Sequence, residues 1–184
     1  MKRAIGLLEF NSIAKGILGA DAMVKTARVE LIQGMPVCPG KFIAMIAGDI
    51  SSVNSAIEAG IKVSNVGVID KFILANVDDA VFPALTGTVE INDNDLEALG
   101  IIETFSVASA IVAADAVAKA AIVRLLEVRT ARGMGGKSLV YFTGDVGAVQ
   151  AALEVGERFA KEEGVLAGSA LIPAPYKELW EKLL

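Results

Sequence analysis

The 184-residue sequence contains no histidine and only one cysteine, and these two absences exclude most of the common catalytic sites. Without histidine the most frequent general base in enzymes is missing, so neither a Ser-His-Asp triad nor a Cys-His pair can be assembled. A single thiol can form neither an intramolecular disulfide nor a four-ligand metal site within one chain. The sequence therefore predicts that the protein turns over no substrate.

Aromatic residues and basic clusters are also scarce. Aromatics make up 5% of the sequence, the net charge is −5, and no run of Lys or Arg is interleaved with aromatic side chains. Nucleic-acid binding needs a strongly positive surface, so this composition predicts no nucleic-acid partner. The apolar content of 54% comes mainly from Ala, Val, Ile and Leu, which suits closely packed helices and strands.

Long apolar runs are missing as well, although the mean hydropathy of +0.56 is high for a soluble chain. A membrane-spanning helix needs roughly 18 apolar residues, and the longest charge-free stretch, residues 164–176, contains Pro173 and Pro175. We expect no membrane partner and assign the excess apolar surface to contacts between subunits. The N-terminal segment lacks a signal-peptide cleavage site, which together with the single cysteine predicts a reducing, cytoplasmic setting.

The most informative feature that is present is an internal duplication. Residues 4–31 match residues 98–125 at a shift of 94, and residues 40–60 match residues 136–156 at a shift of 96. The second copy therefore carries two extra residues between Leu125 and Gly136. The polar stretch near residue 92 predicts one domain over residues 1–92 and a second over residues 93–184.

Each copy predicts the same order of elements, βαββαβ. Strands are expected at residues 5–10, 28–32, 42–47 and 66–75, and again at residues 101–105, 122–128, 139–143 and 165–172. Ser12 and Ser106 are suitable N-caps for the first helix of each copy, and Gly60 and Gly156 are expected to end the second helix as C′ glycines. The predicted fold class is α/β, of the α+β kind, with two tandem ferredoxin-like domains.

Acidic residues recur in both copies, and paired carboxylates can perform acid–base catalysis. A residue that both copies keep is expected, however, to serve each domain separately. We therefore predict that these residues cap helices, form turns or make salt bridges. The twinned pairs are Glu9 and Glu103, Asp21 and Asp115, and Asp49 and Asp145.

Cys38 has no twin, because its counterpart at a shift of 96 is Met134. A lone cysteine is commonly an inert small hydrophobe, but this one lies between Pro36 and Pro39 at the tip of a turn, where a thiol tends to face solvent. If three chains met at one axis, three copies of Cys38 would converge and could ligate an iron–sulfur cluster. The fourth iron would then need a non-protein ligand such as water.

Several short motifs recur in the two copies. They are DAMVKTA, GKF…GD and AIEAG in the first copy and AVAKAA, GGK…GD and ALEVG in the second. With these motifs the sequence resembles the shell proteins of bacterial microcompartments, in particular their tandem-domain trimeric class. The LEFNSIAKG opening, the VCPGKF turn and the IPAP…LW tail are similar to members of this class that carry an iron–sulfur cluster at a central pore.

The resemblance implies a homotrimer whose six domains form a flat pseudohexamer, a tile that packs edge to edge with other shell proteins. It implies one [4Fe-4S] cluster per trimer, bound by three Cys38 thiolates and a non-protein ligand, for electron transfer with a lumen redox enzyme or for cluster delivery across the shell. It places edge lysines at Lys25 and Lys119. The pore would be lined by Met35, Pro36, Val37, Pro39, Gly40, Gly133, Met134, Gly135 and Gly136.

Two alternatives stay open at this point. In the first, the chain is a shell tile with a metal-free gated pore, and Cys38 only lines the channel. In the second, it is a ferredoxin-like regulatory trimer that binds a small effector between subunits. A tile assembles into sheets or tubes, whereas a regulator stays a discrete trimer whose melting temperature changes with a metabolite. Ala174 stands where many single-domain shell proteins have an arginine, so edge contacts are expected to differ from theirs.

Overall fold

The computed structural model describes residues 3–91 and 96–183, and the chain divides into two compact units. The first unit is Met1–Asp79 together with the short segment Ala131–Gly136, and the second is Ala80–Thr130 with Lys137–Leu184. The predicted domain boundary at residue 92 falls within residues 92–95, outside the described residues, and stays a prediction. No helix in the described ranges is long and apolar enough to cross a membrane.

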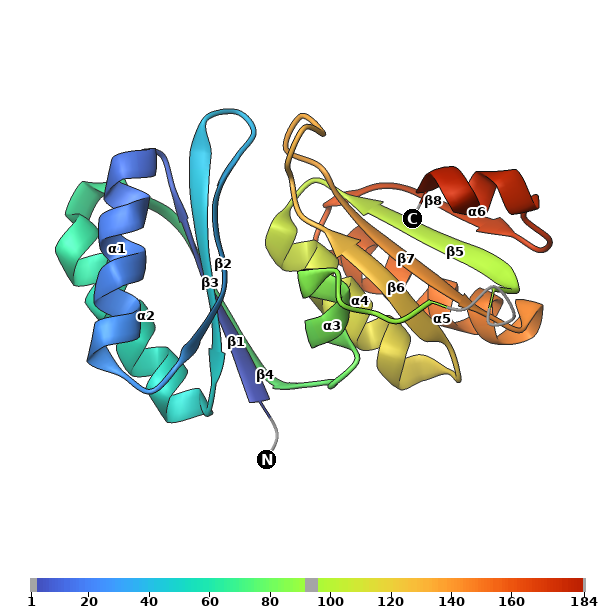
Figure 1. Cartoon of the computed structure of the whole chain (residues 1–184), viewed down its shortest axis with the longest axis horizontal. Coiled ribbons are helices and arrows are strands. Elements are labelled where there is room, and N and C mark those ends of the chain that lie inside the picture. The colour runs from blue at the N-terminus through green and yellow to red at the C-terminus, as the bar shows by residue number, and fades with distance from the viewer. Residues whose placement is uncertain (1–2, 92–95, 184) are drawn as a thin grey trace. The chain divides into compact units, whose positions relative to one another are not determined.

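The first unit is a four-stranded antiparallel sheet with two helices on one face (Figure 1). Its strands lie in the order β2-β3-β1-β4, with β1 Arg3–Phe10, β2 Glu30–Val37, β3 Lys41–Gly48 and β4 Val68–Val77. The helices are α1, Ile13–Thr26, and α2, Ile50–Ser64, which is followed by the short 3-10 helix η1, Asn65–Gly67.

The second unit repeats this arrangement, which confirms the predicted tandem βαββαβ fold. Its strands lie in the order β6-β7-β5-β8, with β5 Ala98–Thr104, β6 Arg124–Arg129, β7 Ser138–Gly144 and β8 Leu166–Ile172. Its two long helices are α4, Val107–Ala120, and α5, Val146–Glu162. Two further short helices, α3 (Val81–Thr86) and α6 (Lys177–Leu183), were not predicted from the sequence.

The strand registers extend the repeat beyond the region where the sequences visibly match. Gly6 pairs with Ile73 in the first sheet, and its equivalent Gly100 pairs with Leu171 in the second. The fourth strands are therefore equivalent at a shift of 98 (171 − 73), rather than 94 or 96. Because α3 follows β4 and α6 follows β8, the same shift makes α3 the equivalent of α6.

Serine N-caps begin the first helix of each unit, as predicted. The Ser12 hydroxyl oxygen accepts a hydrogen bond from the Lys15 backbone N–H at 3.4 Å, and the Ser106 hydroxyl oxygen accepts one from Ser109 at 3.1 Å. These bonds satisfy backbone donors that the first turn of a helix leaves unpaired. The caps therefore fix where each long helix leaves the preceding strand.

Gly60 and Gly156 do not end their helices, so the prediction of a C′ glycine at either position is wrong. Helix α2 continues to Ser64 and α5 to Glu162. A Cβ atom at Gly60 would lie 2.8 Å from Cδ1 of Leu8, and one at Gly156 would lie 2.4 Å from Cδ1 of Ile102. Both glycines are therefore required for close packing of the second helix against the sheet.

We expect Gly60→Val to lower the free energy of unfolding by about 2–3 kcal/mol, because overpacking a filled core typically costs roughly that much. Urea unfolding followed by circular dichroism would measure the loss. Glu58→Val is the control, since it introduces valine into the same helix at an exposed position, outside the core. Equal midpoints for the two variants would contradict the packing role of Gly60.

Candidate functional site

Cys38 begins the tight turn between β2 and β3. Because β2 ends at Val37 and β3 begins at Lys41, the turn consists of Cys38, Pro39 and Gly40. Gly40 has a φ angle of 78°, in the left-handed region that favours glycine. Cys38 is a free, partly exposed cysteine. That the Cys38 thiol serves as a ligand at this turn stays a prediction.

The turn between β6 and β7, residues 131–136, is grouped with the first unit and lies beside Cys38. The backbone N–H of Cys38 donates a hydrogen bond to the carbonyl oxygen of Ala131 at 3.1 Å. A Cβ atom at Gly136 would lie 3.5 Å from the Cys38 carbonyl oxygen. The structure thus brings together two turns that were predicted separately from the two copies. Their role as the lining of a pore stays a prediction.

The registers also locate the two extra residues of the second copy in this turn. Met35 pairs with Ile43 in the first sheet, and the equivalent residues Arg129 and Leu139 pair in the second. The strands are thus in the same register up to the turn, and the insertion only lengthens the turn itself. Three of its glycines have positive φ angles, 74° at residue 133, 63° at residue 135 and 92° at residue 136.

Equivalent ion pairs lie at the start of β3 and β7, next to the two turns. Lys41 Nζ is 2.6 Å from a carboxylate oxygen of Glu9, and Lys137 Nζ is 3.1 Å from one of Glu103. Lys137 Nζ also lies 5.9 Å from the centre of the Phe105 ring. The lysines at the base of the turns are therefore largely neutralised by carboxylates of their own units.

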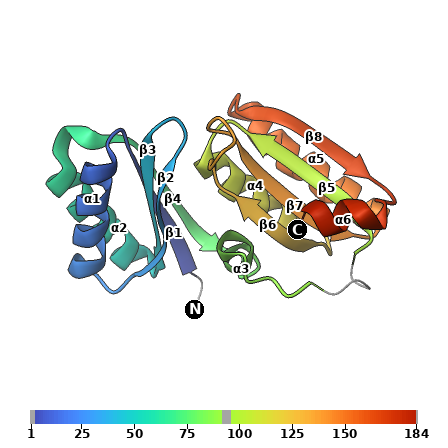
Figure 2. The same cartoon turned by 45° about the horizontal axis from the view of Figure 1, so that its top comes forward.

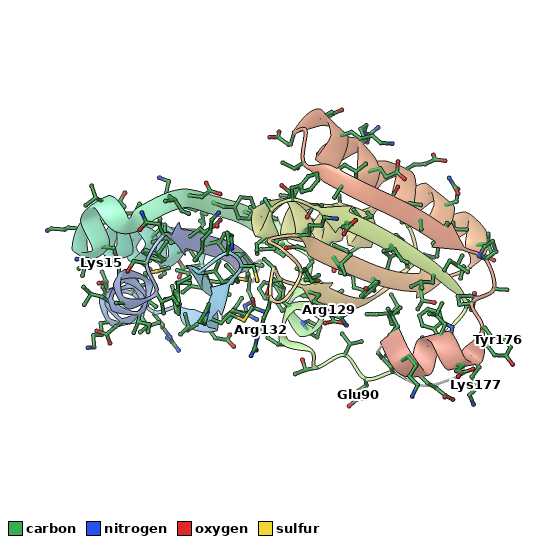
Figure 3. The ribbon with its side chains drawn as sticks, turned by 90° about the horizontal axis from the view of Figure 1, so that it is seen from above. Lys15, Glu90, Arg129, Arg132, Tyr176 and Lys177 are labelled. Carbon is green, nitrogen blue, oxygen red and sulfur yellow. The ribbon has the colours of Figure 1, made fainter. Side chains whose placement is uncertain are left out.

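Arg132 is a cation of the second turn and was not among the predicted site residues. It is exposed and directly follows Ala131, the residue that accepts the hydrogen bond from Cys38 (Figure 3). Over residues 3–91 and 96–183, no hydrogen bond or ion pair is found for its guanidinium group. Only the three-dimensional structure places this charge near the cysteine, because the two residues belong to different copies of the repeat.

A single chain cannot hold an iron–sulfur cluster with these residues. Among the described residues, no three His, Cys, Asp or Glu side chains lie close enough together to bind a metal ion. Such clusters are normally held by four cysteine thiolates, and Cys38 supplies one. The donor set fits a cluster only if several chains contribute their Cys38 residues to one site, which the partial exposure of this residue allows.

The twinned carboxylates serve their own units, which confirms the prediction of capping and salt-bridging roles. Four of them form ion pairs with lysines, and the other two accept hydrogen bonds from the first turn of the helix that follows. At Asp49, hydrogen bonds from the hydroxyls of Ser51 and Ser52 hold the pKa of the carboxyl well below its ordinary value. No catalytic pair of carboxylates is found in the part of the chain that the structure describes.

The predicted edge lysines lie at equivalent places, in the last turns of α1 and α4. Lys25 pairs with Asp21 and Lys119 with Asp115, in both cases at 2.7 Å and one helical turn apart. The two sites differ in exposure, since 72% of the Lys25 side chain is exposed and 45% of the Lys119 side chain. Their contact with a neighbouring tile stays a prediction.

Comparison with known proteins gives the family. The chain matches the BMC domain model twice, over residues 4–77 and 98–175. It is 40% identical over 184 residues to the bacterial microcompartment shell protein PduT of Citrobacter freundii, covering 100% of this chain and 99% of that protein. It is also 40% identical over 86 residues to the microcompartment shell protein EutM of Salmonella typhimurium, covering 47% of this chain and 88% of EutM.

A solved structure of a microcompartment protein from Desulfitobacterium hafniense DCB has the same fold. It aligns with a TM-score of 0.95 and 46% sequence identity, covering 98% of this chain and 99% of that chain. The relatives are shell proteins rather than enzymes, in agreement with the prediction that no substrate is turned over. This protein therefore belongs to the bacterial microcompartment shell proteins and carries two BMC domains in tandem.

Proposed function

We propose that this shell protein forms a homotrimeric tile, a pseudohexamer, with a [4Fe-4S] cluster at its central pore. Three copies of Cys38 and one non-protein ligand would hold the cluster. The observation that carries the proposal is the position of Cys38, a free and partly exposed thiol at a turn that is held against the second pore turn. The shell family favours this function over that of a regulatory trimer.

Symmetry supports this use of one cysteine. Two equivalent domains per chain allow three chains to mimic a sixfold ring while keeping threefold symmetry. Each chain then brings one cysteine turn to the axis, and three thiols cannot all pair as disulfides because one is always left over. Three thiolates make up most of the ligand set that an iron–sulfur cluster needs.

The residues of the turns would fix the ligand and limit access to it. Pro36 and Pro39 restrict the backbone on both sides of Cys38, and the bond to Ala131 fixes the Cys38 backbone. A bound cluster would supply one-electron transfer between the two sides of the shell, or would be delivered to a redox enzyme in the lumen. Such a site is open on at least one side and is expected to lose iron in air.

Anaerobic reconstitution of the wild-type protein tests the proposal. We expect a brown trimer with broad visible absorption and about four iron atoms per trimer. Absence of iron after reconstitution would contradict the cluster and leave a tile with a metal-free gated pore. Electron microscopy of the same sample tests tile formation separately, because sheets or tubes do not depend on the metal.

Arg132 is expected to tune the cluster if the proposal holds. Reduction adds negative charge, which a nearby guanidinium stabilises, and net charge is one of the factors that set cluster potentials. We expect Arg132→Glu to lower the midpoint potential by tens of millivolts in anaerobic redox titration, with a smaller shift at high salt. Arg158→Glu is the matched control, since Arg158 is exposed on α5, outside both turns. Equal potentials for the two variants would rule out this role of Arg132.

A further inference from the structure

Helix α3, which follows the first repeat, covers an apolar surface of the second unit. It packs against β6 and α4. Four of its six residues are buried, and Val81 is 0% exposed. In the two elements that α3 packs against, Leu125 of β6 is 2% exposed and Ile111 of α4 is 0% exposed. This contact inside the chain is the pattern on which the inference rests.

Helix α6 is the equivalent of α3 but is buried on one side only. At the shift of 98, Phe82 corresponds to Trp180 and Val81 corresponds to Leu179. Trp180 is buried in a cluster with Leu99 and its neighbours. Helix α6 itself lies on the face of the second sheet opposite α4 and α5 (Figure 2). Leu179, in contrast, is 40% exposed. The side of α6 that carries Leu179 is therefore uncovered.

The first unit has an equivalent surface that could receive such a helix, and this surface is uncovered. At the shift of 94, Leu31 of β2 corresponds to Leu125 and Ile17 of α1 corresponds to Ile111. Leu31 is 43% exposed and Ile17 is 56% exposed, whereas both equivalents are buried in the second unit. The helix surface that α3 buries thus has an uncovered equivalent on α6. The surface of β6 and α4 that α3 packs against has an uncovered equivalent on β2 and α1.

We propose that α6 of one chain packs against β2 and α1 of a second copy of this chain, as α3 packs against β6 and α4 within one chain. The inference rests on the proposed homotrimer and identifies the surfaces that join its subunits. The donor surface is Leu179 on α6, and the acceptor surface is Leu31 with Ile17. Two different surfaces meet, so the contact is head to tail and can close into a ring.

Two single variants test this contact in the full-length protein. Leu31→Asp alters only the acceptor surface, and Leu179→Asp alters only the donor surface. Burying an unpaired carboxylate is expected to weaken each contact on the order of 100-fold or more. Either variant alone should then be a 19.1 kDa monomer at micromolar concentration in sedimentation analysis and native mass spectrometry.

Mixing the two variants in equal amounts gives the decisive result. The Leu31→Asp variant keeps an intact donor surface, and the Leu179→Asp variant keeps an intact acceptor surface, so these two surfaces can join. The other two surfaces of the mixture are both altered and cannot join. We expect a heterodimer of twice 19.1 kDa that does not grow further. A contact between identical surfaces could not produce this outcome, because each variant would then be defective or intact on its own.

Matched controls separate this contact from a general effect of a new surface charge. Val63→Asp on α2 and Phe159→Asp on α5 replace residues that are 43% and 40% exposed, the same fractions as Leu31 and Leu179. Both controls should stay trimeric. Circular dichroism melting checks the fold of every variant, and the neutral pair Leu31→Gln and Leu179→Gln replaces any variant that fails to fold.

Three outcomes would overturn the inference. Single variants that remain trimers while the wild type is a trimer would show that other surfaces join the subunits. A mixture that stays monomeric would show that the two surfaces do not meet. A wild-type protein that is itself monomeric would overturn the proposed homotrimer together with this contact, so failure of the trimer is distinguished from failure of the interface.

Discussion

Cys38→Ser is expected to give a folded trimer that binds no iron and stays colourless after anaerobic reconstitution. One substitution removes all three protein ligands at once, because symmetry repeats it in every chain, and the serine hydroxyl does not replace a thiolate as a cluster ligand. The fold should be preserved. The turn is short, the side chain is partly exposed, and the hydrogen bond to Ala131 comes from the backbone N–H, which serine keeps.

Met134→Ser is the matched control for this variant. Met134 lies at the equivalent position of the second turn, so the substitution removes a sulfur atom near the same site without removing a thiolate. Iron and sulfide analysis should give wild-type values for Met134→Ser and none for Cys38→Ser, with identical trimers in light scattering. A Cys38→Ser protein that takes up iron as well as the wild type would defeat the cluster proposal, although the shell function would still stand.

The parts of the fold that follow from local sequence were predictable. The duplication alone indicates two like domains, and Ser12 and Ser106 mark the helix starts because an N-cap bonds to backbone groups only three residues away. The twinned carboxylates were also assigned correctly, since ion pairs one helical turn apart depend only on spacing.

The parts that depend on distant contacts were not predictable from one sequence. A glycine such as Gly60 is typical of a helix end. Its role here is instead set by its close packing against Leu8, which lies on a strand far away in the sequence. Helices α3 and α6 are too short to show a helical period and are stabilised by packing on sheets, through residues such as Trp180. The proximity of Cys38 to the turn that holds Arg132 likewise joins the two copies of the repeat.

The edge lysines should control assembly of trimers into sheets. We expect Lys25→Asp combined with Lys119→Asp to leave trimers intact but to abolish sheets in electron micrographs. Within one chain Lys25 and Asp21 form an exposed ion pair one helical turn apart, which contributes only about 0.3–0.5 kcal/mol. Lys119 forms the equivalent pair with Asp115, whose side chain is buried. On a tile the same side chain would be repeated at every junction, and reversing its charge would place carboxylates against the neighbouring tile.

The double variant Lys62→Asp with Lys161→Asp separates this edge effect from a change of net charge. Both variants move the net charge from −5 to −9, because each of the two Lys→Asp changes contributes −2. Lys62 and Lys161 also lie in the last turns of their helices, so both variants carry the same unfavourable interaction with the helix dipole. Sheets that form from the control but not from Lys25→Asp with Lys119→Asp would support the edge assignment. Sheets from both variants would exclude a role for these lysines at the junction, and loss of sheets in both would trace the effect to net charge alone.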